Sequence, residues 1–304
     1  MSPSRAMMTP VLFLVFNRPE PTRLVFESIR AARPSALYVA GDGPRPEVDH
    51  DAEKCERARQ IATAVDWDCS LHTRFQEQNL GPGPGVSSAI TWFFENVEEG
   101  IIVEDDCAPG RWFYRFCEEL LDYYRKRPAV MHISGHNYQY GRKRGKGSYY
   151  FSKYTHVGGW ATWRRAWQHY DGTLIPEHER GEIWDAAWLF SVSGAGGVAA
   201  LPNANLVSNI GFGADATHTR TKGRFAFIPA VEMDFPLVHP PEIAIDRAAD
   251  ALTYYANFRN IPDLRFVWAY QVLDFLRLIV PRARKLAAKF REWRREVDAR
   301  ATHE

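Results

Sequence analysis

The first half of the chain alternates short apolar runs with segments of helical periodicity. Apolar runs at residues 11–16, 36–40 and 100–103 are typical of buried strands, and a short strand is also expected at residues 71–75. The stretches between them predict helices, at residues 19–32, 51–65 and 86–95. Strands that alternate with helices in this way predict a parallel sheet.

The second half has a different pattern. Residues 112–125 predict a helix and residues 129–134 a further strand. From there to about residue 241, short segments separated by glycines and rich in aromatic residues predict a less regular lobe. A proline-rich junction follows, after which residues 264–298 are expected to be mainly helical.

One apolar run ends in three consecutive carboxylates, Glu104, Asp105 and Asp106. Because an unpaired buried carboxylate costs several kcal/mol, we expect the cluster to emerge at the carboxyl edge of the sheet, where α/β proteins bind ligands. Carboxylate oxygens suit Mg²⁺ or Mn²⁺, which combine one or two carboxylates with phosphate oxygens. The pattern predicts either a metal–phosphate site or an acidic turn without a ligand.

Polar residues also follow the neighbouring strands. Asn17 and Arg18 follow the first strand, and Asp42 and Gly43 follow the second. Asp42 could accept hydrogen bonds from a base or ribose, and Arg18 could offset phosphate charge. Glycines of the loop at residues 79–85 would let backbone amides approach a phosphate. Each piece alone is ordinary loop chemistry, but their convergence at one edge favours a nucleotide site.

Composition narrows the classes of partner. At 304 residues the chain suits one large domain with an appendage or two closely associated subdomains. Its apolar fraction of 45% and charged fraction of 25% are ordinary for a globular protein. A formal net charge of +1 argues against a general polyanion-binding surface, and so against a nucleic-acid partner. Ten tryptophans and 13 tyrosines suit a cleft for sugars or bases, or a large core.

The cysteines and apolar runs indicate the compartment. Cys55, Cys69, Cys107 and Cys117 form no Cys-x-x-Cys pair and no metal-ligand spacing, so we expect reduced thiols. The first apolar run ends after six residues and is too short for a signal peptide. No run approaches the roughly 18 apolar residues of a membrane-spanning helix. The expected location is cytoplasmic.

A series of blocks in a fixed order carries a family resemblance. The blocks are the strand at 11–16 with Arg18, residues 33–36 leading to Asp42, 102–106 followed by 112–113, 133–137, 158–160, 183–185 with Trp188, and 211–213 with His218. In these blocks, which span residues 9–240, the chain resembles the GT-A class of nucleotide-sugar glycosyltransferases, and most closely the family of the eukaryotic N-acetylglucosaminyltransferase I catalytic domain. Residues 241–304 match no part of that family.

The resemblance implies a fold and an activity. The fold is α/β, with a GT-A (Rossmann-like), mostly parallel central sheet, an irregular acceptor lobe and a helical C-terminal tail. The activity is the inverting, metal-dependent transfer of a sugar from a nucleoside-diphosphate sugar to a hydroxyl of a glycan acceptor. The expected donor is a UDP-sugar, and the expected process is polysaccharide biosynthesis. The implied parts are a nucleotide-sugar-binding subdomain (1–135), an acceptor-binding and catalytic subdomain (136–240) and a helical extension (241–304).

The resemblance also implies roles for individual residues. Asp106 would be the protein ligand of Mn²⁺ or Mg²⁺, Asp105 would contact the ribose or sugar, and Glu104 would orient the cluster. Arg18 and Asp42 would hold the nucleotide. Further candidates for the nucleotide-sugar site are Asn17, Gly43, Asn79, Gly85, Ser88, Trp184 and His218. His218 would either lie on a loop that closes over the phosphates or bind the metal itself.

The catalytic base is assigned through the same resemblance. Asp185 matches the family's base, which takes the proton of the attacking acceptor hydroxyl and so gives inversion in a single displacement. The chain departs from the family here, because Ala186 replaces a second acid and an extra residue precedes Trp188. Three further acids therefore stay candidates for the base: Glu177, Glu182 and Asp215.

Two other classes of function stay open. A metal-dependent sugar nucleotidyltransferase would share the sheet and the acids, but it would need a Gly-rich loop with a catalytic basic residue after the first strand. A non-catalytic glycan-binding relative would have lost the acids, which this chain retains. His132 and His136 are interpreted as packing and acceptor-contact residues. The aromatic residues at 149–154 are interpreted as acceptor cleft or core.

The C-terminal segment has a pattern of its own. Leu286, Phe290, Trp293 and Val297 recur at helical spacing, and arginines and lysines surround them. A basic amphipathic helix of this kind suits peripheral contact with an anionic membrane, here the inner membrane face. Docking on the body of the protein or in a homodimer is the alternative.

Overall fold

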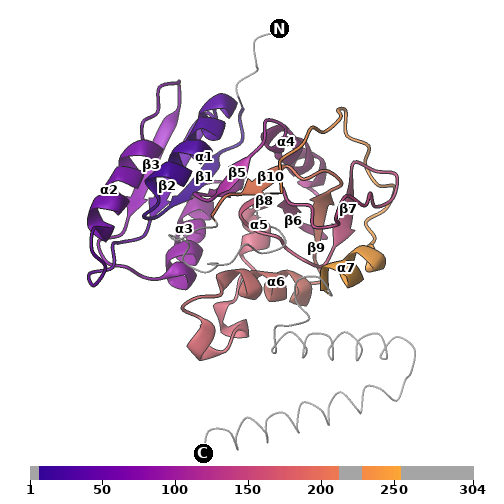
Figure 1. Cartoon of the computed structure of the whole chain (residues 1–304). Helices are drawn as coiled ribbons and strands as arrows, with labels where there is room; N and C mark the ends of the chain where they lie inside the picture. Colours follow the sequence, from indigo (N-terminus) through magenta and orange to yellow (C-terminus); the bar gives the residue numbers. More distant parts are fainter. Residues whose placement is uncertain (1–6, 212–227, 255–304) are drawn as a thin grey trace, which may run out of the picture. The chain divides into compact units, whose positions relative to one another are not determined.

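The computed structural model describes residues 7–211 and 228–254 (Figure 1). Residues up to Asp250 belong to one compact unit, and residues from Ala251 onward belong to a second. The predicted C-terminal helices, His218 and Asp215 lie outside the described residues.

The first half of the chain forms the parallel part of the central sheet, as its pattern predicted. Strand β1 pairs in parallel with β2 on one side and with β4 on the other, and β2 pairs in parallel with β3. Val15 is level with Gly41, and Leu14 is level with Glu104. The carboxyl ends of these strands therefore meet at one edge. The bounds are β1 (Val11–Val15), β2 (Ala36–Gly41), β3 (Ser70–Phe75) and β4 (Glu99–Glu104).

Helices cover both faces of this parallel part (Figure 1). Alternate residues of β1 point to opposite faces, so that Phe13 packs in one apolar cluster with α1 while Leu12 packs in another with α3. Both faces are thus buried at β1, β2 and β4, which explains why these three strands are continuous apolar runs. The helices are α1 (Pro19–Ala32), α2 (Asp51–Ala62) and α3 (Pro82–Asn96).

The prediction of an irregular lobe after residue 135 needs correction. The second half adds four strands to the same sheet, whose order is β3-β2-β1-β4-β8-β6-β9-β7. Strand β8 lies between β4 and β6 and is antiparallel to both, β6 and β9 are parallel, and β7 is antiparallel to β9. Strand β6 confirms the strand predicted at residues 129–134. All residues of β7, β8 and β9 are buried, so no polar alternation marked these three as strands. The four strands are β6 (Val130–Ser134), β7 (Tyr149–Ser152), β8 (Gly159–Trp163) and β9 (Val198–Pro202).

A two-stranded antiparallel sheet lies next to the acid cluster. It is formed by β5 (Cys107–Pro109) and β10 (Val207–Asn209), with Cys107 opposite Asn209. The hydrogen bond from the Ile210 N–H to the Asp106 carbonyl oxygen continues this pairing. The main chain on both sides of Asp106 is therefore held by regular pairing.

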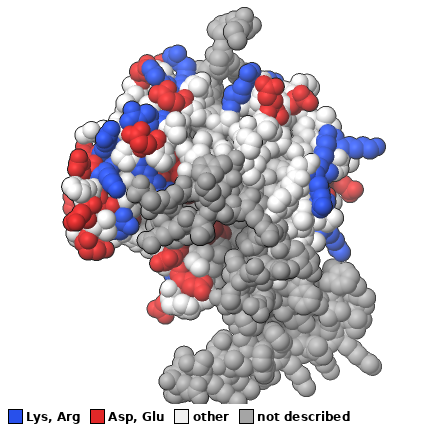
Figure 2. Space-filling model, viewed as in Figure 1, with Lys and Arg blue, Asp and Glu red and all other residues white. Residues whose placement is uncertain are grey.

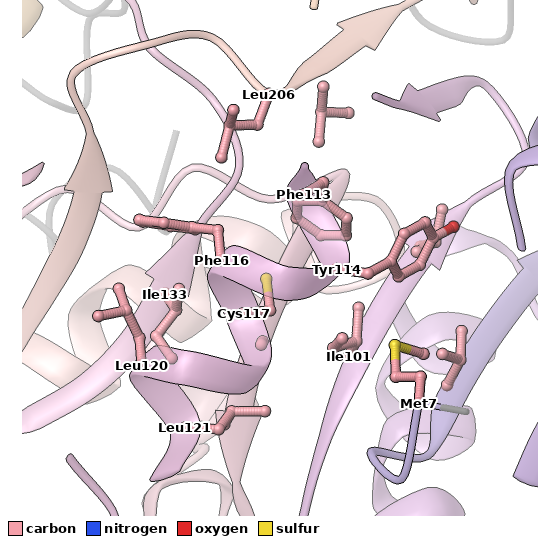
Figure 3. Packing of buried hydrophobic residues seen from close by; sticks show 14 of the residues in the cluster. Met7, Ile101, Phe113, Tyr114, Phe116, Cys117, Leu120, Leu121, Ile133 and Leu206 are labelled. Atoms are coloured by element: carbon pink, nitrogen blue, oxygen red, sulfur yellow. The ribbon is translucent and has the colours of Figure 1, made fainter. Parts of the chain in front are cut away.

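Helix α4 (Phe113–Tyr124) closes one face of the second half. Phe113, Phe116 and Leu120 are fully buried and belong to one core cluster with Ile133 of β6 (Figure 3). The remaining described helices are α5 (Arg164–Trp167), α6 (Trp184–Gly194) and α7 (Arg247–Thr253), with 3-10 turns at Gly172–Leu174 and Glu177–Glu179.

Three observations bear on the remaining predictions. Helix α3 begins at Pro82, four residues before the predicted start at 86, because its proline-glycine run is helical. All four cysteines are free thiols. Within the described part of the chain, no helix has the length and apolar character needed to cross a membrane.

Candidate functional site

A cavity of about 220 Å³ lies at the carboxyl ends of β1, β2, β3 and β4. It is bounded by the sheet edge and by the first turns of α3, which contribute Pro82, Gly85 and Val86. The predicted site residues among its walls are Arg18, Asp42, Asn79, Gly85, Glu104, Asp105 and Asp106. The strand ends are therefore gathered around one cavity, as expected for a parallel sheet.

The acid triplet forms one wall of this cavity. The Asp105 side chain is buried, and its Oδ2 accepts a hydrogen bond of 3.0 Å from the Phe16 N–H. Asp106 Oδ2 lies 2.6 Å from Arg18 Nη1, and Asp106 Oδ1 accepts a hydrogen bond of 3.2 Å from Cys107 Sγ. Both oxygens of Asp106 thus have a defined neighbour, and its side chain is 21% exposed.

Burial and mutual repulsion control the charge of this cluster. Burial raises the pKa of Glu104, and the charges of Asp106 and Asp105 raise it further. Burial likewise raises the pKa of Asp105, with a second contribution from Asp106. Arg18 opposes both shifts but does not cancel them. When all three are ionised, three carboxylates facing one guanidinium leave an excess of negative charge in the cavity.

That excess is the observation that fits a divalent cation. The buried Glu104 Oε1 has no hydrogen-bond partner among the described residues, so the cluster is electrostatically incomplete. No three described His, Cys, Asp or Glu side chains are grouped to hold a metal by themselves. A cation here would therefore take one or two carboxylates, Asp106 with its 21% exposed side chain among them, and complete its shell with phosphate oxygens and water.

Asp42 has a structural task at the end of β2. Its carboxylate accepts hydrogen bonds from the Leu80 N–H at 2.9 Å, the Gly81 N–H at 3.0 Å and the Asn79 side-chain amide at 3.1 Å. It therefore organises the loop that leads into α3. Asp42 and Asn79, joined by the last of these hydrogen bonds, both line the cavity.

The prediction that this loop's amides approach a phosphate needs correction. Pro82 and Pro84 have no N–H, and the Gly81 N–H is bound to Asp42. The Gly83 N–H donates to the Gly181 carbonyl oxygen at 2.9 Å. A Cβ on Gly83 would lie 2.1 Å from the Arg180 carbonyl oxygen, so this glycine is required by the close approach of residues 180–181.

Besides the candidate base Asp185, four predicted residues lie outside the walls of the cavity. The Asn17 side chain donates to Asp51 and ties the end of β1 to the start of α2. Ser88 Oγ donates to the Gly85 carbonyl oxygen at 3.2 Å. Gly43 packs against the Gln78 backbone. Trp184 is 6% exposed and stacks on Trp160 in the core, with ring centroids 6.1 Å apart.

The candidate base Asp185 is exposed on the first turn of α6. Its Oδ1 accepts a hydrogen bond of 2.9 Å from the Ala186 N–H. Its negative charge contributes to the raised pKa of Glu104, so the two carboxylates act on each other electrostatically. The alternatives Glu177 and Glu182 are also exposed and precede α6. The hydrogen bond between Gly83 and Gly181 fixes this segment against α3.

Sequence reasoning missed several residues of the cavity. Arg74 and Gln76, at the end of β3, line it and follow the same strand-end rule that identified Asp42. Arg45 also lines it, but its guanidinium is paired with Asp51 at 2.8 Å. No local pattern marked Cys107, whose contact with Asp106 depends on the turn after β4.

The histidines and aromatic residues of the second half are packing residues. His132 Nδ1 accepts from Trp188 Nε1–H at 3.1 Å, and its Nε2 donates to the His156 carbonyl oxygen at 3.0 Å. Burial lowers the pKa of His132 to about 3 and that of His136 to about 4. The aromatic residues predicted as acceptor cleft or core are in the core: Tyr149, Tyr150, Phe151 and Tyr154.

Charges on the visible surface are mixed. Figure 2 shows acidic and basic side chains interspersed over the part of the molecule that carries α1 and α2, and basic groups at the edge near β7. The loop at residues 141–147, which precedes β7, is largely exposed. On this face the described basic side chains are interrupted by acidic and uncharged ones.

Comparison with known proteins gives no family. No protein-family model matches the chain, and a search of curated proteins finds no match. Among solved structures the chain is similar to HddC from Yersinia pseudotuberculosis, with a TM-score of 0.30 and 9% sequence identity. The match covers 52% of this chain and 78% of HddC. At that score the likeness supports no conclusion about fold or function.

Proposed function

We propose that this protein is an inverting, metal-dependent glycosyltransferase of the GT-A kind that uses a nucleoside-diphosphate sugar. The observation that carries the proposal is the acid triplet at the end of β4, in a cavity shared with the ends of β1 and β2. A sugar nucleotide has a diphosphate, which needs positive charge, and a nucleoside, which needs an adjacent slot. The cavity combines carboxylates that can hold a cation, the Arg18 guanidinium and an adjacent space for the nucleoside.

The residues of the cavity have distinct tasks in such a reaction. Asp106 would hold Mn²⁺ or Mg²⁺, which supplies positive charge to the diphosphate leaving group. Arg18, bonded to Asp106, adds a fixed positive charge at the same point. Asp105 is oriented by the Phe16 N–H and would contact the ribose or sugar. Burial of these groups in a cavity strengthens every electrostatic contact with the ligand.

The acceptor side requires a base. A hydroxyl is a poor nucleophile, so a carboxylate must take its proton during attack. Asp185 is exposed on the first turn of α6, where a glycan acceptor can reach it. Because a single base acts opposite the leaving group, the product would have the anomeric configuration inverted from that of the donor.

The test is a hydrolysis and transfer screen of nucleotide sugars with Mn²⁺, combined with calorimetric titration of nucleoside diphosphates. The wild-type protein should bind a nucleoside diphosphate only when Mn²⁺ or Mg²⁺ is present, and Asp106→Ala should abolish that binding. Asp122→Ala is the matched control, because that carboxylate is 76% exposed on α4. Release of nucleoside diphosphate identifies a glycosyltransferase, whereas release of pyrophosphate identifies a nucleotidyltransferase. Unchanged titration heats for Asp106→Ala would refute the assignment.

A further inference from the structure

The cavity continues away from the acid triplet as a slot between the sheet and α3. Leu14 and Ala40 form the sheet side, and Val86 and Ala89 form the helix side. The walls are apolar, and the small side chains at 40 and 89, together with Gly85, leave the space open. Apolar walls with a few convergent polar groups are typical of a slot for a flat ring.

Polar groups are concentrated at the far end of this slot. Arg74 is level with Ala40 in the pairing of β2 and β3, and Gln76 follows directly after β3. The Gln76 N–H donates to the Gly41 carbonyl oxygen at 2.9 Å, which fixes its backbone beside β2. Three strand spacings, about 14 Å in total, separate this end from the acids on β4.

Arg74 differs from the other two arginines of the cavity. Arg18 is paired with Asp106 at 2.6 Å, and Arg45 with Asp51 at 2.8 Å. Arg74 Nη1 donates to the Ser88 carbonyl oxygen at 2.9 Å, but Arg74 forms no ion pair with any residue that the structure describes. A guanidinium has five N–H donors in a planar fork and no acceptor. Donors of Arg74 are therefore available to a ligand in the slot.

We propose that this slot holds the nucleobase of the donor, and that Arg74 and Gln76 read a lactam edge, a ring carbonyl beside a ring N–H. Uracil, thymine and guanine have this edge, and adenine and cytosine do not. The inference rests on the proposed function, because the diphosphate at Asp106 places the base in the slot.

The selectivity follows from the donor-only character of Arg74. Its N–H groups pair with a carbonyl oxygen, as arginine does with guanine in nucleic-acid recognition. Adenine and cytosine carry an amino group at the corresponding position, which would set donor against donor and leave both without a partner. The Gln76 side-chain oxygen can accept the neighbouring ring N–H, a hydrogen that adenine and cytosine lack at that position.

The experiment is calorimetric titration of the full chain with Mn²⁺ and five probes: UDP, GDP, ADP, CDP and pyrophosphate. UDP or GDP should bind about ten- to a hundredfold more tightly than ADP and CDP. Arg74→Met should remove that preference and leave pyrophosphate affinity unchanged. Arg74→Lys, which keeps the charge but loses the fork, should also remove most of it. Arg57→Met, at a guanidinium 62% exposed on α2, is the control and should behave as wild type.

A second variant separates the role of Gln76. Gln76→Glu keeps an oxygen acceptor and should retain the lactam preference, whereas Gln76→Leu should weaken UDP or GDP without weakening ADP or CDP. Retained pyrophosphate binding shows that each variant is folded.

Each remaining outcome has a distinct meaning. Equal affinity of wild type for all four nucleotides would overturn the lactam assignment while the proposed function stands. A fall in pyrophosphate affinity for Arg74→Met, equal to the fall for UDP and accompanied by an unchanged melting temperature, would overturn it by making Arg74 a phosphate ligand. Binding of none of the five probes by wild type would overturn the proposed function itself.

Discussion

Arg18 Nη1 lies 2.6 Å from Asp106 Oδ2, while Arg18 Nη1 and Asp105 Oδ1 are 4.0 Å apart. One guanidinium at the start of α1 therefore faces two consecutive carboxylates at the end of β4. Both partners are largely buried, with side-chain exposures of 14% for Arg18 and 21% for Asp106. Arg18 is thus the internal counter-ion of the acid triplet, in the position where positive charge from a metal would act.

Removing this counter-ion should destabilise the metal-free protein. Arg18→Met leaves buried carboxylates without their cation, so we expect a loss of about 3 kcal/mol in the free energy of unfolding at neutral pH. Mn²⁺ should then raise the melting temperature more in the variant than in wild type, because it replaces the missing charge. Thermal melts with and without Mn²⁺ measure both effects. Arg23→Met, at an arginine 48% exposed, is the control. Equal melting temperatures for Arg18→Met and wild type would contradict the counter-ion role.

The raised pKa values of Glu104 and Asp105 should give the metal-free protein an unusual pH dependence. Between the ordinary carboxyl pKa of about 4 and neutral pH, Glu104 and Asp105 bind more protons in the folded state than in the unfolded state. The free energy of unfolding should therefore fall as pH rises through this range. Glu104→Gln should reduce the slope, as urea unfolding at a series of pH values would show. Glu98→Gln, at a carboxylate 81% exposed, should keep the wild-type slope. A slope unaffected by Glu104→Gln would disprove the electrostatic account.

Gly83 should tolerate no side chain. The Cβ of Gly83→Ala would lie 2.1 Å from the Arg180 carbonyl oxygen, a backbone atom, so the loop before α6 must shift. We expect a loss of about 1–3 kcal/mol by urea unfolding, despite alanine's better helix propensity. Gly194→Ala is the matched control, because its Cβ would meet nothing within 4 Å, and it should be neutral or stabilising. If the two variants are equally stable, residues 180–181 do not require the glycine.

Asp185 should affect transfer and not donor binding. If it is the base, Asp185→Asn should lower the transfer rate by roughly 10²–10⁴-fold, while the affinity for nucleoside diphosphate with Mn²⁺ stays the same. NMR of the product should show the anomeric configuration opposite to that of the donor. Glu182→Gln and Glu177→Gln test the alternatives on the preceding segment. If Asp185→Asn turns over normally and Glu182→Gln or Glu177→Gln loses transfer activity, the glutamate replaced in the inactive variant is the base and Asp185 is not.

The sequence by itself determined the parallel half of the sheet and the position of the acid triplet. Apolar strands alternating with helical segments admit few arrangements other than a parallel sheet, in which carboxyl ends share one edge. Glu104 and Asp42 could therefore be placed at that edge from their order in the chain alone. The same rule applied to β3 would have identified Arg74, whose pairing level with Ala40 brings it into the cavity.

Only the tertiary structure decided the rest, because it depends on contacts between distant segments. Strand β8 enters between β4 and β6, and its buried tryptophans pack on both faces, which hides the strand periodicity. The glycines of the loop at 79–85 were predicted together to let backbone amides approach a phosphate, but Gly83 makes room for residues 180–181 instead. Trp184 belongs to the core because Trp160, a neighbour only in the fold, covers it. Local pattern specifies where a strand ends, whereas the neighbour of each side chain is set by packing.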